Sequence, residues 1–262
     1  MIEEILSYLI LGLIQGLTEF LPVSSSGHLT LCSELLGIKS DDITFKVLVH
    51  FATALSTIIV FREDIMNLIS SFFKRDNSSN SARNYIGLLA LSAIPAAFVG
   101  FTMKGQIEAL DNPQFVGYML IVTALILAVS QKLNASQEKG VNGSRSILIG
   151  LAQALAVLPG ISRSGSTIGT ALLLGVSREE AARFSFLMAM PVIIGATLLE
   201  TKELLEVGAT TSGPLMGYVV GVIAAFVSGL IACKLMIRLV KDTNLLWFAV
   251  YCAVVGLIAI II

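Results

Sequence analysis

The sequence predicts an all-α polytopic membrane protein with six transmembrane helices and two re-entrant helix–loop–helix pairs, arranged as an inverted repeat. Composition is the first observation behind this prediction. Of the 262 residues, 55% are hydrophobic and 13% are charged, whereas soluble domains carry roughly 25% charged residues. The mean hydropathy of +0.87 also indicates a membrane protein. The net charge of −1 and the lack of a basic cluster predict no nucleic-acid partner.

The spacing of apolar stretches is the second observation. Six stretches are long enough to cross about 30 Å of hydrocarbon, and they are Ile43–Phe61, Tyr85–Met103, Gln114–Lys132, Arg183–Leu199, Pro214–Met236 and Leu245–Ile262. Two further apolar regions, Ile5–Leu36 and Ile147–Leu174, are interrupted by Pro, Gly and Ser, so each predicts two half-helices joined by irregular backbone. The connecting loops are short, which predicts a single domain over residues 1–262.

The distribution of Lys and Arg is the third observation, and it predicts the topology. These residues gather in the segments 62–84, 132–145 and 234–241, whereas 104–113 and 200–213 carry one lysine each. The positive-inside rule therefore places the first three segments in the cytoplasm and the last two outside. Arg178 and Arg183 are then cytoplasmic as well, so the region 146–177 enters the membrane and returns. With the N-terminus and Asp41-Asp42 outside, Ile5–Leu36 is predicted to enter from the opposite face.

A sequence repeat links the two interrupted regions. Gly12-x-x-Gln15 recurs 138 residues later as Gly150-x-x-Gln153, and at the same offset Ser24-Ser-Ser-Gly27 matches Ser162-Arg-Ser-Gly165. One residue further on, Phe45-x-x-Leu48 matches Phe184-x-x-Leu187. Chance similarity between Leu- and Gly-rich sequences is the alternative, but separate matches near one offset favour a true repeat of residues 1–133 and 146–262. Three spans lie between the copies, so their orientations are predicted to be opposite, with a binding site near the membrane midplane where the breaks meet.

The first break carries a carboxylate at membrane depth, where a charged side chain costs about 2.5–3.5 kcal/mol on insertion scales. Gln15 and Glu19 share one helix face because they are four residues apart. A hydrogen bond between packed helices is the simpler interpretation of Glu19. Its position beside a Ser-rich break and a histidine instead predicts a general base or a metal ligand, and carboxylate and amide oxygens suit Mg²⁺ or Ca²⁺.

Three hydroxyls and an imidazole follow within a few residues, namely Ser24, Ser25, Ser26 and His28. Loop hydroxyls and free N–H groups in such a break are predicted to hold a phosphate. His28 is predicted to act as nucleophile, general acid or hydrogen-bond donor, and any of the three serines is the alternative nucleophile, activated by His28 or Glu19. His50 lies in the middle of a predicted span and fits a packing histidine better than a site residue.

The second break, Pro159-Gly160-Ile-Ser162-Arg163-Ser164-Gly165, predicts an anion-binding loop. Glycines allow the backbone to approach a ligand closely, serine hydroxyls donate, and an arginine binds phosphate with two parallel N–H groups. The alternative for Arg163 is an ion pair with Glu19 between the two breaks, which is compatible with phosphate binding once a substrate arrives.

Together these motifs resemble one known family. The pattern Gln15-x-x-x-Glu19-Phe-Leu-Pro-Val-Ser-Ser-Ser-Gly-His28, followed by Pro159-Gly-x-Ser-Arg163-Ser-Gly165, is similar to the undecaprenyl-diphosphate phosphatase family, also called bacitracin-resistance proteins. The resemblance covers essentially the whole chain. It implies a multi-pass enzyme of the bacterial-type inner (cytoplasmic) membrane that hydrolyses undecaprenyl diphosphate to undecaprenyl phosphate, which recycles the carrier lipid for peptidoglycan synthesis. It also implies help from a divalent cation and an active site open towards the outer face.

The resemblance assigns roles to particular residues. The family's acidic pair maps to Gln15 and Glu19, its serine–histidine motif to Ser24, Ser25 and His28, and its arginine motif to Ser162 and Arg163. Other members have a glutamate where this chain has Gln15, so the metal or base role shifts to Glu19.

Two other functions are considered. Type-2 phosphatidic acid phosphatases share Ser-Gly-His and Ser-Arg motifs but need a second histidine after the Ser-Arg, and no histidine follows His50 here. The remaining alternative is a transporter or flippase of an anionic prenyl phosphate lipid, because inverted repeats with broken helices are typical of secondary transporters. The predicted partners are a polyprenyl diphosphate lipid and the membrane, and a homodimer is left open.

Overall fold

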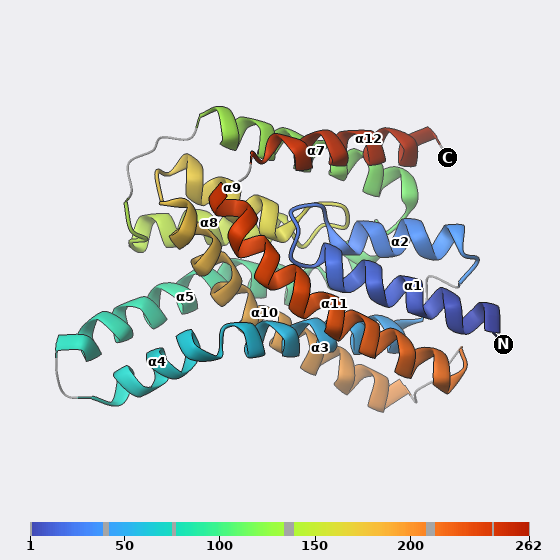
Figure 1. The fold of residues 1–262 in the computed structure, drawn as a ribbon, viewed down its shortest axis with the longest axis horizontal. Coiled ribbons are helices and arrows are strands. Elements are labelled where there is room, and N and C mark those ends of the chain that lie inside the picture. The colour runs from blue at the N-terminus through green and yellow to red at the C-terminus, as the bar shows by residue number, and fades with distance from the viewer. Residues whose placement is uncertain are drawn as a thin grey trace.

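The computed structural model describes residues 2–38, 42–74, 77–133, 139–207, 213–242 and 244–261. Every named element in these ranges is an α-helix, which confirms the all-α prediction (Figure 1). Asp41 of the predicted outer loop and Ile262 at the end of the last predicted span lie outside the described residues.

The helices match the predicted apolar stretches. In chain order they are α1 (Ile2–Thr18), α2 (Ser25–Leu35), α3 (Ile43–Val60), α4 (Arg62–Phe73), α5 (Asn77–Thr102), α6 (Lys104–Glu108), α7 (Pro113–Lys132), α8 (Gly143–Leu155), α9 (Arg163–Leu173), α10 (Arg178–Val207), α11 (Leu215–Asp242) and α12 (Leu246–Ile261). Within the described ranges, 4 helices are long and apolar enough to cross a membrane, or 5 if α3 and α4 form one span bent by 67°. The polytopic membrane prediction is therefore confirmed.

Several helices extend beyond the predicted spans. The segment 62–84 was predicted as a loop, but α4 occupies much of it and α5 begins at Asn77, well before the expected start at Tyr85. That part of the prediction is wrong. Hydropathy marks only the residues suited to hydrocarbon and does not mark where a helix begins or ends, so polar residues of α4 and of the first turns of α5 fell outside the predicted spans although they are helical.

The two interrupted regions are broken helices, as predicted. Residues 19–24 separate α1 from α2, and residues 156–162 separate α8 from α9. Ser24 caps α2 by accepting a hydrogen bond from the Gly27 N–H at 3.3 Å, and Ser162 caps α9 by accepting from the Gly165 N–H at 3.1 Å. Each cap satisfies one amide of a first helical turn. The serine of the repeat motif therefore has the same structural role in both halves, which is to cap the helix that begins after the break.

Close backbone contacts hold the first half-helix of each pair. α1 packs along α11, and α8 packs along α5. A Cβ atom on Gly12 would lie 2.1 Å from the Gly221 carbonyl oxygen, and one on Gly150 would lie 2.5 Å from the Ser92 carbonyl oxygen. Small residues of this kind allow membrane helices to approach closely. Each broken pair is thus anchored on a long helix from the other half of the chain.

Polar and apolar contacts fix the helices around the breaks. Asp42 accepts hydrogen bonds from the Tyr8 hydroxyl at 3.0 Å and the Tyr218 hydroxyl at 2.7 Å, which joins α1, α3 and α11. On the other side of the molecule, Leu127, Leu172 and Phe184 share a fully buried core of α7, α9 and α10. The breaks therefore lie within a packed framework.

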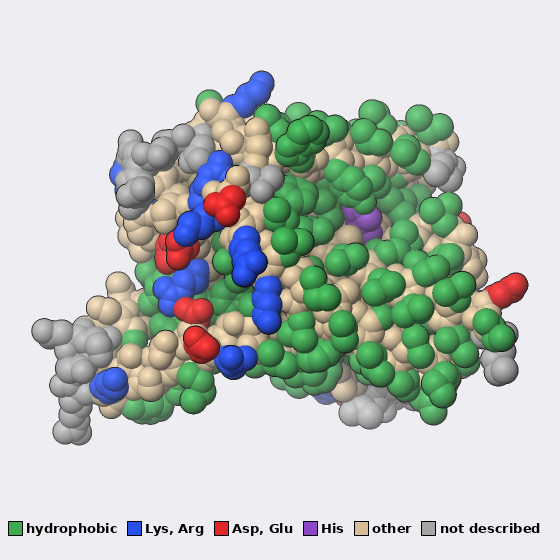
Figure 2. Space-filling view, viewed as in Figure 1, with side chains coloured by type: hydrophobic (Ala, Val, Ile, Leu, Met, Phe, Trp, Pro, Cys, Tyr) green, Lys and Arg blue, Asp and Glu red, His purple; other side chains and the backbone are tan. Residues whose placement is uncertain are grey.

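Charged side chains are concentrated at one end of the molecule. In Figure 2 they gather where α11 ends and α10 begins, while hydrophobic side chains cover most of the remaining face. Ion pairs there join Arg183 to Asp64, with Nη2 and Oδ1 2.6 Å apart, and Lys241 to Glu179, with Nζ and Oε2 3.3 Å apart. This end contains three of the segments predicted to be cytoplasmic.

Candidate active site

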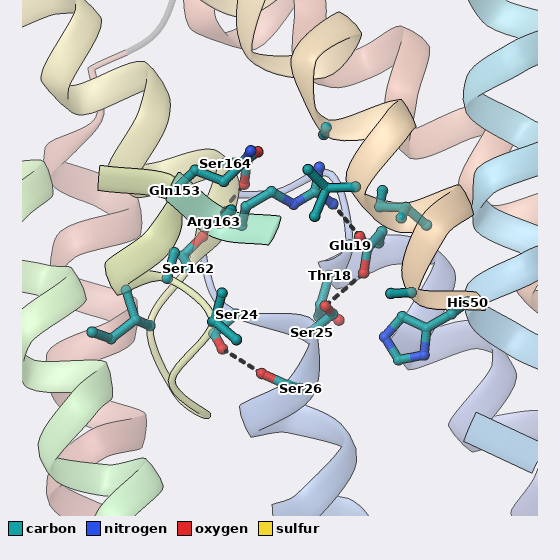
Figure 3. A pocket seen from close by; sticks show the side chains of 18 of the residues that line it. Thr18, Glu19, Ser24, Ser25, Ser26, His50, Gln153, Ser162, Arg163 and Ser164 are labelled. Carbon is teal, nitrogen blue, oxygen red and sulfur yellow. Dashed lines mark hydrogen bonds and ion pairs between the residues drawn. The ribbon is translucent and has the colours of Figure 1, made fainter. Parts of the chain in front are cut away.

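A cavity of about 240 Å³ lies between the two breaks (Figure 3). Its polar lining comes from both breaks and from the helices α1, α2, α3, α8, α9 and α10, and consists of Thr18, Glu19, Ser24, Ser25, Ser26, His50, Gln153, Ser162, Arg163, Ser164 and Thr197. The rest of the lining is apolar and includes Ala96, Val157, Val192 and Ala196. Residues of the two breaks therefore line one shared cavity.

Glu19 is the centre of the hydrogen-bond network in the cavity. Its Oε1 forms an ion pair with Arg163 Nη2, and its Oε2 accepts from Ser25 Oγ at 2.7 Å and from Gln15 Nε2 at 3.0 Å (Figure 3). The carboxylate is only 6% exposed. A buried carboxylate needs such partners, because desolvation of an unpaired charge is costly. The ion pair considered as the alternative for Arg163 is therefore present.

Ser25 and Arg163 occupy equivalent positions in the two halves. Each is the first residue of its helix, directly after the capping serine, and they are 138 residues apart. Hydroxyl pairs flank them in the same way, because Ser24 Oγ lies 3.3 Å from Ser26 Oγ and Ser162 Oγ lies 3.3 Å from Ser164 Oγ. One half thus supplies a hydroxyl to Glu19 and the other half supplies a cation.

This arrangement suits an anionic ligand. The first residues of α2 and α9 both line the cavity, and helix N-termini present unpaired N–H groups and a partial positive charge. A guanidinium and several hydroxyls add further donors. A hydroxyl hydrogen-bonded to a carboxylate is also the arrangement of an activated nucleophile and its base. The site can therefore bind a phosphate and attack it.

His28 does not line this cavity. Its Nδ1 lies 2.8 Å from the Ser24 carbonyl oxygen, and its Nε2 lies 2.8 Å from the Tyr251 hydroxyl, whose ring stacks on the imidazole. Both ring nitrogens are thus engaged, with the ring directed to α12. Of the residues predicted to be catalytic, the structure brings Glu19, Ser24, Ser25 and Arg163 to the cavity and leaves His28 outside its lining.

The predicted binding residues divide into two groups. Ser26, Ser162 and Ser164 line the cavity, whereas Gly160 and Gly165 shape the backbone behind it. Gly160 has a φ of 91°, and a Cβ there would lie 2.6 Å from the Val116 carbonyl oxygen, so only glycine fits. Its own carbonyl accepts from Thr123 Oγ1 at 3.1 Å, which fixes the second break on α7.

Four polar residues of the cavity lining were not predicted as site residues, namely Thr18, His50, Gln153 and Thr197. His50 on α3 was interpreted as a packing histidine, and its Nδ1 does lie 2.8 Å from the Lys46 carbonyl oxygen, yet the residue lines the cavity. Gln153 was recognised only as a marker of the repeat. For Gln153 the repeat held a usable signal, because at the 138-residue offset it corresponds to Gln15, which was predicted as a site residue.

A cation site built by protein ligands alone is not evident. Among the described residues, no group of three or more His, Cys, Asp or Glu side chains is placed to hold a metal ion. Glu19 is the single carboxylate among the cavity-lining residues, and the Oε1 of neighbouring Gln15 has no hydrogen-bond partner within the described part of the chain. Mg²⁺ is often bound by one or two carboxylates together with substrate phosphates. The oxygen ligands present fit a cation held jointly with a diphosphate.

Comparisons with known proteins identify similar chains. A family model described as Bacitracin resistance protein BacA matches residues 8–258. A protein of Bacteroides fragilis named undecaprenyl-diphosphatase is 45% identical over 259 residues, which cover 97% of this chain and 96% of the relative. Relatives with the same name from Christiangramia forsetii and Methanosphaera stadtmanae are 45% and 38% identical, and each match covers at least 98% of both chains.

Proposed function

The chain belongs to the bacitracin resistance protein family, and on that basis we propose that it hydrolyses undecaprenyl diphosphate to undecaprenyl phosphate and inorganic phosphate. This reaction returns the carrier lipid to cell-wall synthesis, and bacitracin resistance follows from family membership. The observation that carries the proposal is the cavity in which Ser25, Glu19 and Arg163 meet. It combines a nucleophile, a base and an anion-binding cation in a membrane protein.

The geometry supports a mechanism with a covalent intermediate. Glu19 accepts the Ser25 Oγ proton, and the oxygen attacks the terminal phosphorus while the bond to the bridging oxygen breaks and undecaprenyl phosphate leaves. Arg163 turns from Glu19 to the phosphate oxygens, where it stabilises the developing charge. Glu19 then passes the Ser25 proton to the departing undecaprenyl phosphate and becomes a carboxylate again. It next takes a proton from water, whose oxygen attacks the phosphoserine phosphorus. The bond to Ser25 Oγ breaks, Ser25 recovers the proton, and inorganic phosphate leaves. His28 has a supporting role here, because it holds the Ser24 carbonyl and packs on Tyr251.

A divalent cation fits the same site as an auxiliary group. Glu19 and the serine hydroxyls would hold it together with the diphosphate, whereas Gln15, the other predicted ligand, is fully buried and does not line the cavity. When bound, the cation supplies Lewis-acid neutralisation of phosphate charge.

An apolar groove supports a lipid substrate. A second cavity of about 440 Å³ lies between α5, α6 and α10, and its lining is mostly apolar. It shares Ala96, Val157, Val192 and Ala196 with the first cavity, so the two cavities adjoin. A prenyl chain in this groove would place its diphosphate at Arg163. A water-soluble phosphate ester would gain nothing from the groove.

Phosphate release tests the proposed function. Purified protein is expected to convert undecaprenyl diphosphate to the monophosphate with equimolar inorganic phosphate, and EDTA is expected to lower the rate. Ser7→Ala is a control, because Ser7 bonds the exposed Glu3 carbonyl away from the cavity. Transfer of the lipid between leaflets without any phosphate release would support the transporter instead.

For the layout in the cytoplasmic membrane, we propose the predicted six spans, two re-entrant pairs and an active site open to the outer face. The packing of the helices supports opposite orientations of the two halves. Helix α1 of the first half packs on α11 of the second half, and α8 of the second half packs on α5 of the first half. The charged end in Figure 2 supports a cytoplasmic location for the start of α10.

Cysteine labelling tests this layout. In a chain with Cys32, Cys233 and Cys252 replaced by alanine, Ser144→Cys and Glu179→Cys flank the α8–α9 pair at exposed positions. Both are expected to react only from the cytoplasmic face with a membrane-impermeant maleimide. Reaction of these two positions from opposite faces contradicts a re-entrant pair.

A further inference from the structure

The Gln153 side chain is a buried amide without a partner. It is 1% exposed, and within the described part of the chain neither its Nε2 nor its Oε1 has a hydrogen-bond partner. It nevertheless lines the cavity, on the same wall as Arg163 (Figure 3). Leaving a buried polar group unpaired costs about 1–3 kcal/mol. A ligand in the cavity is the natural source of the missing partner.

The repeat shows how this amide differs from its counterpart. Gln15 stands at the equivalent position and donates to Glu19, four residues later. Four residues after Gln153 the chain has Val157 instead of a carboxylate. The second half therefore keeps the amide donor, but the described residues supply no acceptor for it. An oxygen of the substrate takes that place.

The position of Gln153 indicates which substrate oxygen this is. Val157 stands four residues after Gln153, just beyond the end of α8, and lines both the polar cavity and the apolar groove. Gln153 thus lies next to the junction where a prenyl chain would enter the polar cavity. Ser25 and Glu19 come from the other break. The phosphate nearest Gln153 is then the one bonded to the prenyl chain.

We propose that Gln153 is a substrate-positioning residue whose Nε2–H donates to the lipid-side phosphate, the group that stays on the prenyl product. The proposal rests on the proposed function for the identity of the ligand. The Oε1 then faces a water or the protonated form of the phosphate, because an amide oxygen can only accept. A hydrogen bond to a charged group contributes about 1.5–3 kcal/mol, which corresponds to roughly 10- to 100-fold in affinity.

Binding of two product fragments tests the proposal without relying on turnover. The probes are farnesyl phosphate, which carries the lipid-side phosphate, and inorganic phosphate, which represents the released one, with Kd taken from ligand-dependent shifts in Tm. Gln153→Met, close in shape, is expected to weaken farnesyl phosphate roughly 10- to 100-fold and to leave inorganic phosphate within about twofold. Equal weakening of both ligands, or of neither, overturns the proposal.

Stability separates this role from a structural one. Because the amide is unpaired, Gln153→Met and a second variant, Gln153→Leu, are expected to keep or raise the Tm of the ligand-free protein. Gln15→Leu is the matched control, and it is expected to lower Tm because it removes the donor to Glu19. A fall in Tm for both Gln153 variants overturns the proposal. Wild-type protein that binds farnesyl phosphate but releases no phosphate from the diphosphate counts against the proposed function alone.

Discussion

Ser25→Ala is expected to lower the rate of phosphate release by on the order of 10³-fold or more, because it removes the hydroxyl that attacks phosphorus. The Ser25 Oγ is 2.7 Å from Glu19 Oε2, and it is the serine hydroxyl bonded to that carboxylate among the described residues. Protein folding is expected to be little changed, since Ser24 supplies the cap of α2. The measurement is kcat for undecaprenyl diphosphate, together with trapping of a phosphorylated Ser25 peptide from rapidly quenched wild-type enzyme.

Two neighbouring variants control for this experiment. Ser26→Ala removes a cavity hydroxyl that bonds Ser24 and not Glu19, so its loss of rate is expected to be far smaller. His28→Ala removes the stacking on Tyr251 and is expected to lower Tm. Its loss of kcat/KM is expected to be far smaller than that of Ser25→Ala. If His28→Ala abolished release while Ser25→Ala preserved it, the histidine would be the nucleophile and the orientation of its ring would have to change.

The sequence predicted the two breaks correctly because their cause is local. Pro, Gly and Ser interrupt apolar runs, and Ser24 and Ser162 then cap the next helix through contacts only three residues away. The meeting of the breaks was also predictable, because the repeat and the Lys and Arg distribution together imply opposite orientations. Glu19, Ser25 and Arg163 were therefore correctly placed at one cavity.

The direction of individual side chains was not predictable. Ser24 adopts a φ of 70°, which turns the chain so that Ser25 contacts Glu19. His28, one turn later, contacts Tyr251, 223 positions away in sequence. No local pattern indicates that contact. His50 was likewise missed because α3 must first pack against α10 before its ring can line the cavity.

Arg163 variants are expected to give the other large loss of activity, and they separate the effect of the positive charge from that of the planar guanidinium group. Arg163→Ala is expected to lower kcat/KM by about 10³-fold or more, the range found when an arginine on a transferred phosphoryl group is lost. It also leaves Glu19 buried without its cation, so the free energy of unfolding is expected to fall by about 3–5 kcal/mol. Kinetics with undecaprenyl diphosphate and thermal unfolding measure the two effects.

Arg163→Lys keeps the charge but not the planar pair of donors, so Tm is expected to recover while kcat/KM stays at least about tenfold below wild type. Wild-type kcat/KM in Arg163→Lys contradicts bidentate binding of phosphate. The double variant Glu19→Gln with Arg163→Gln removes both charges and is expected to be more stable than Arg163→Ala, yet inactive. An ion pair that served only to join the two breaks would be replaceable without loss of turnover. Because the double variant also lacks the proposed base, the assignment depends on Arg163→Lys, in which Glu19 is intact. Recovery of stability without activity in Arg163→Lys assigns Arg163 to the substrate, and its pairing with Glu19 to the interval before the substrate arrives.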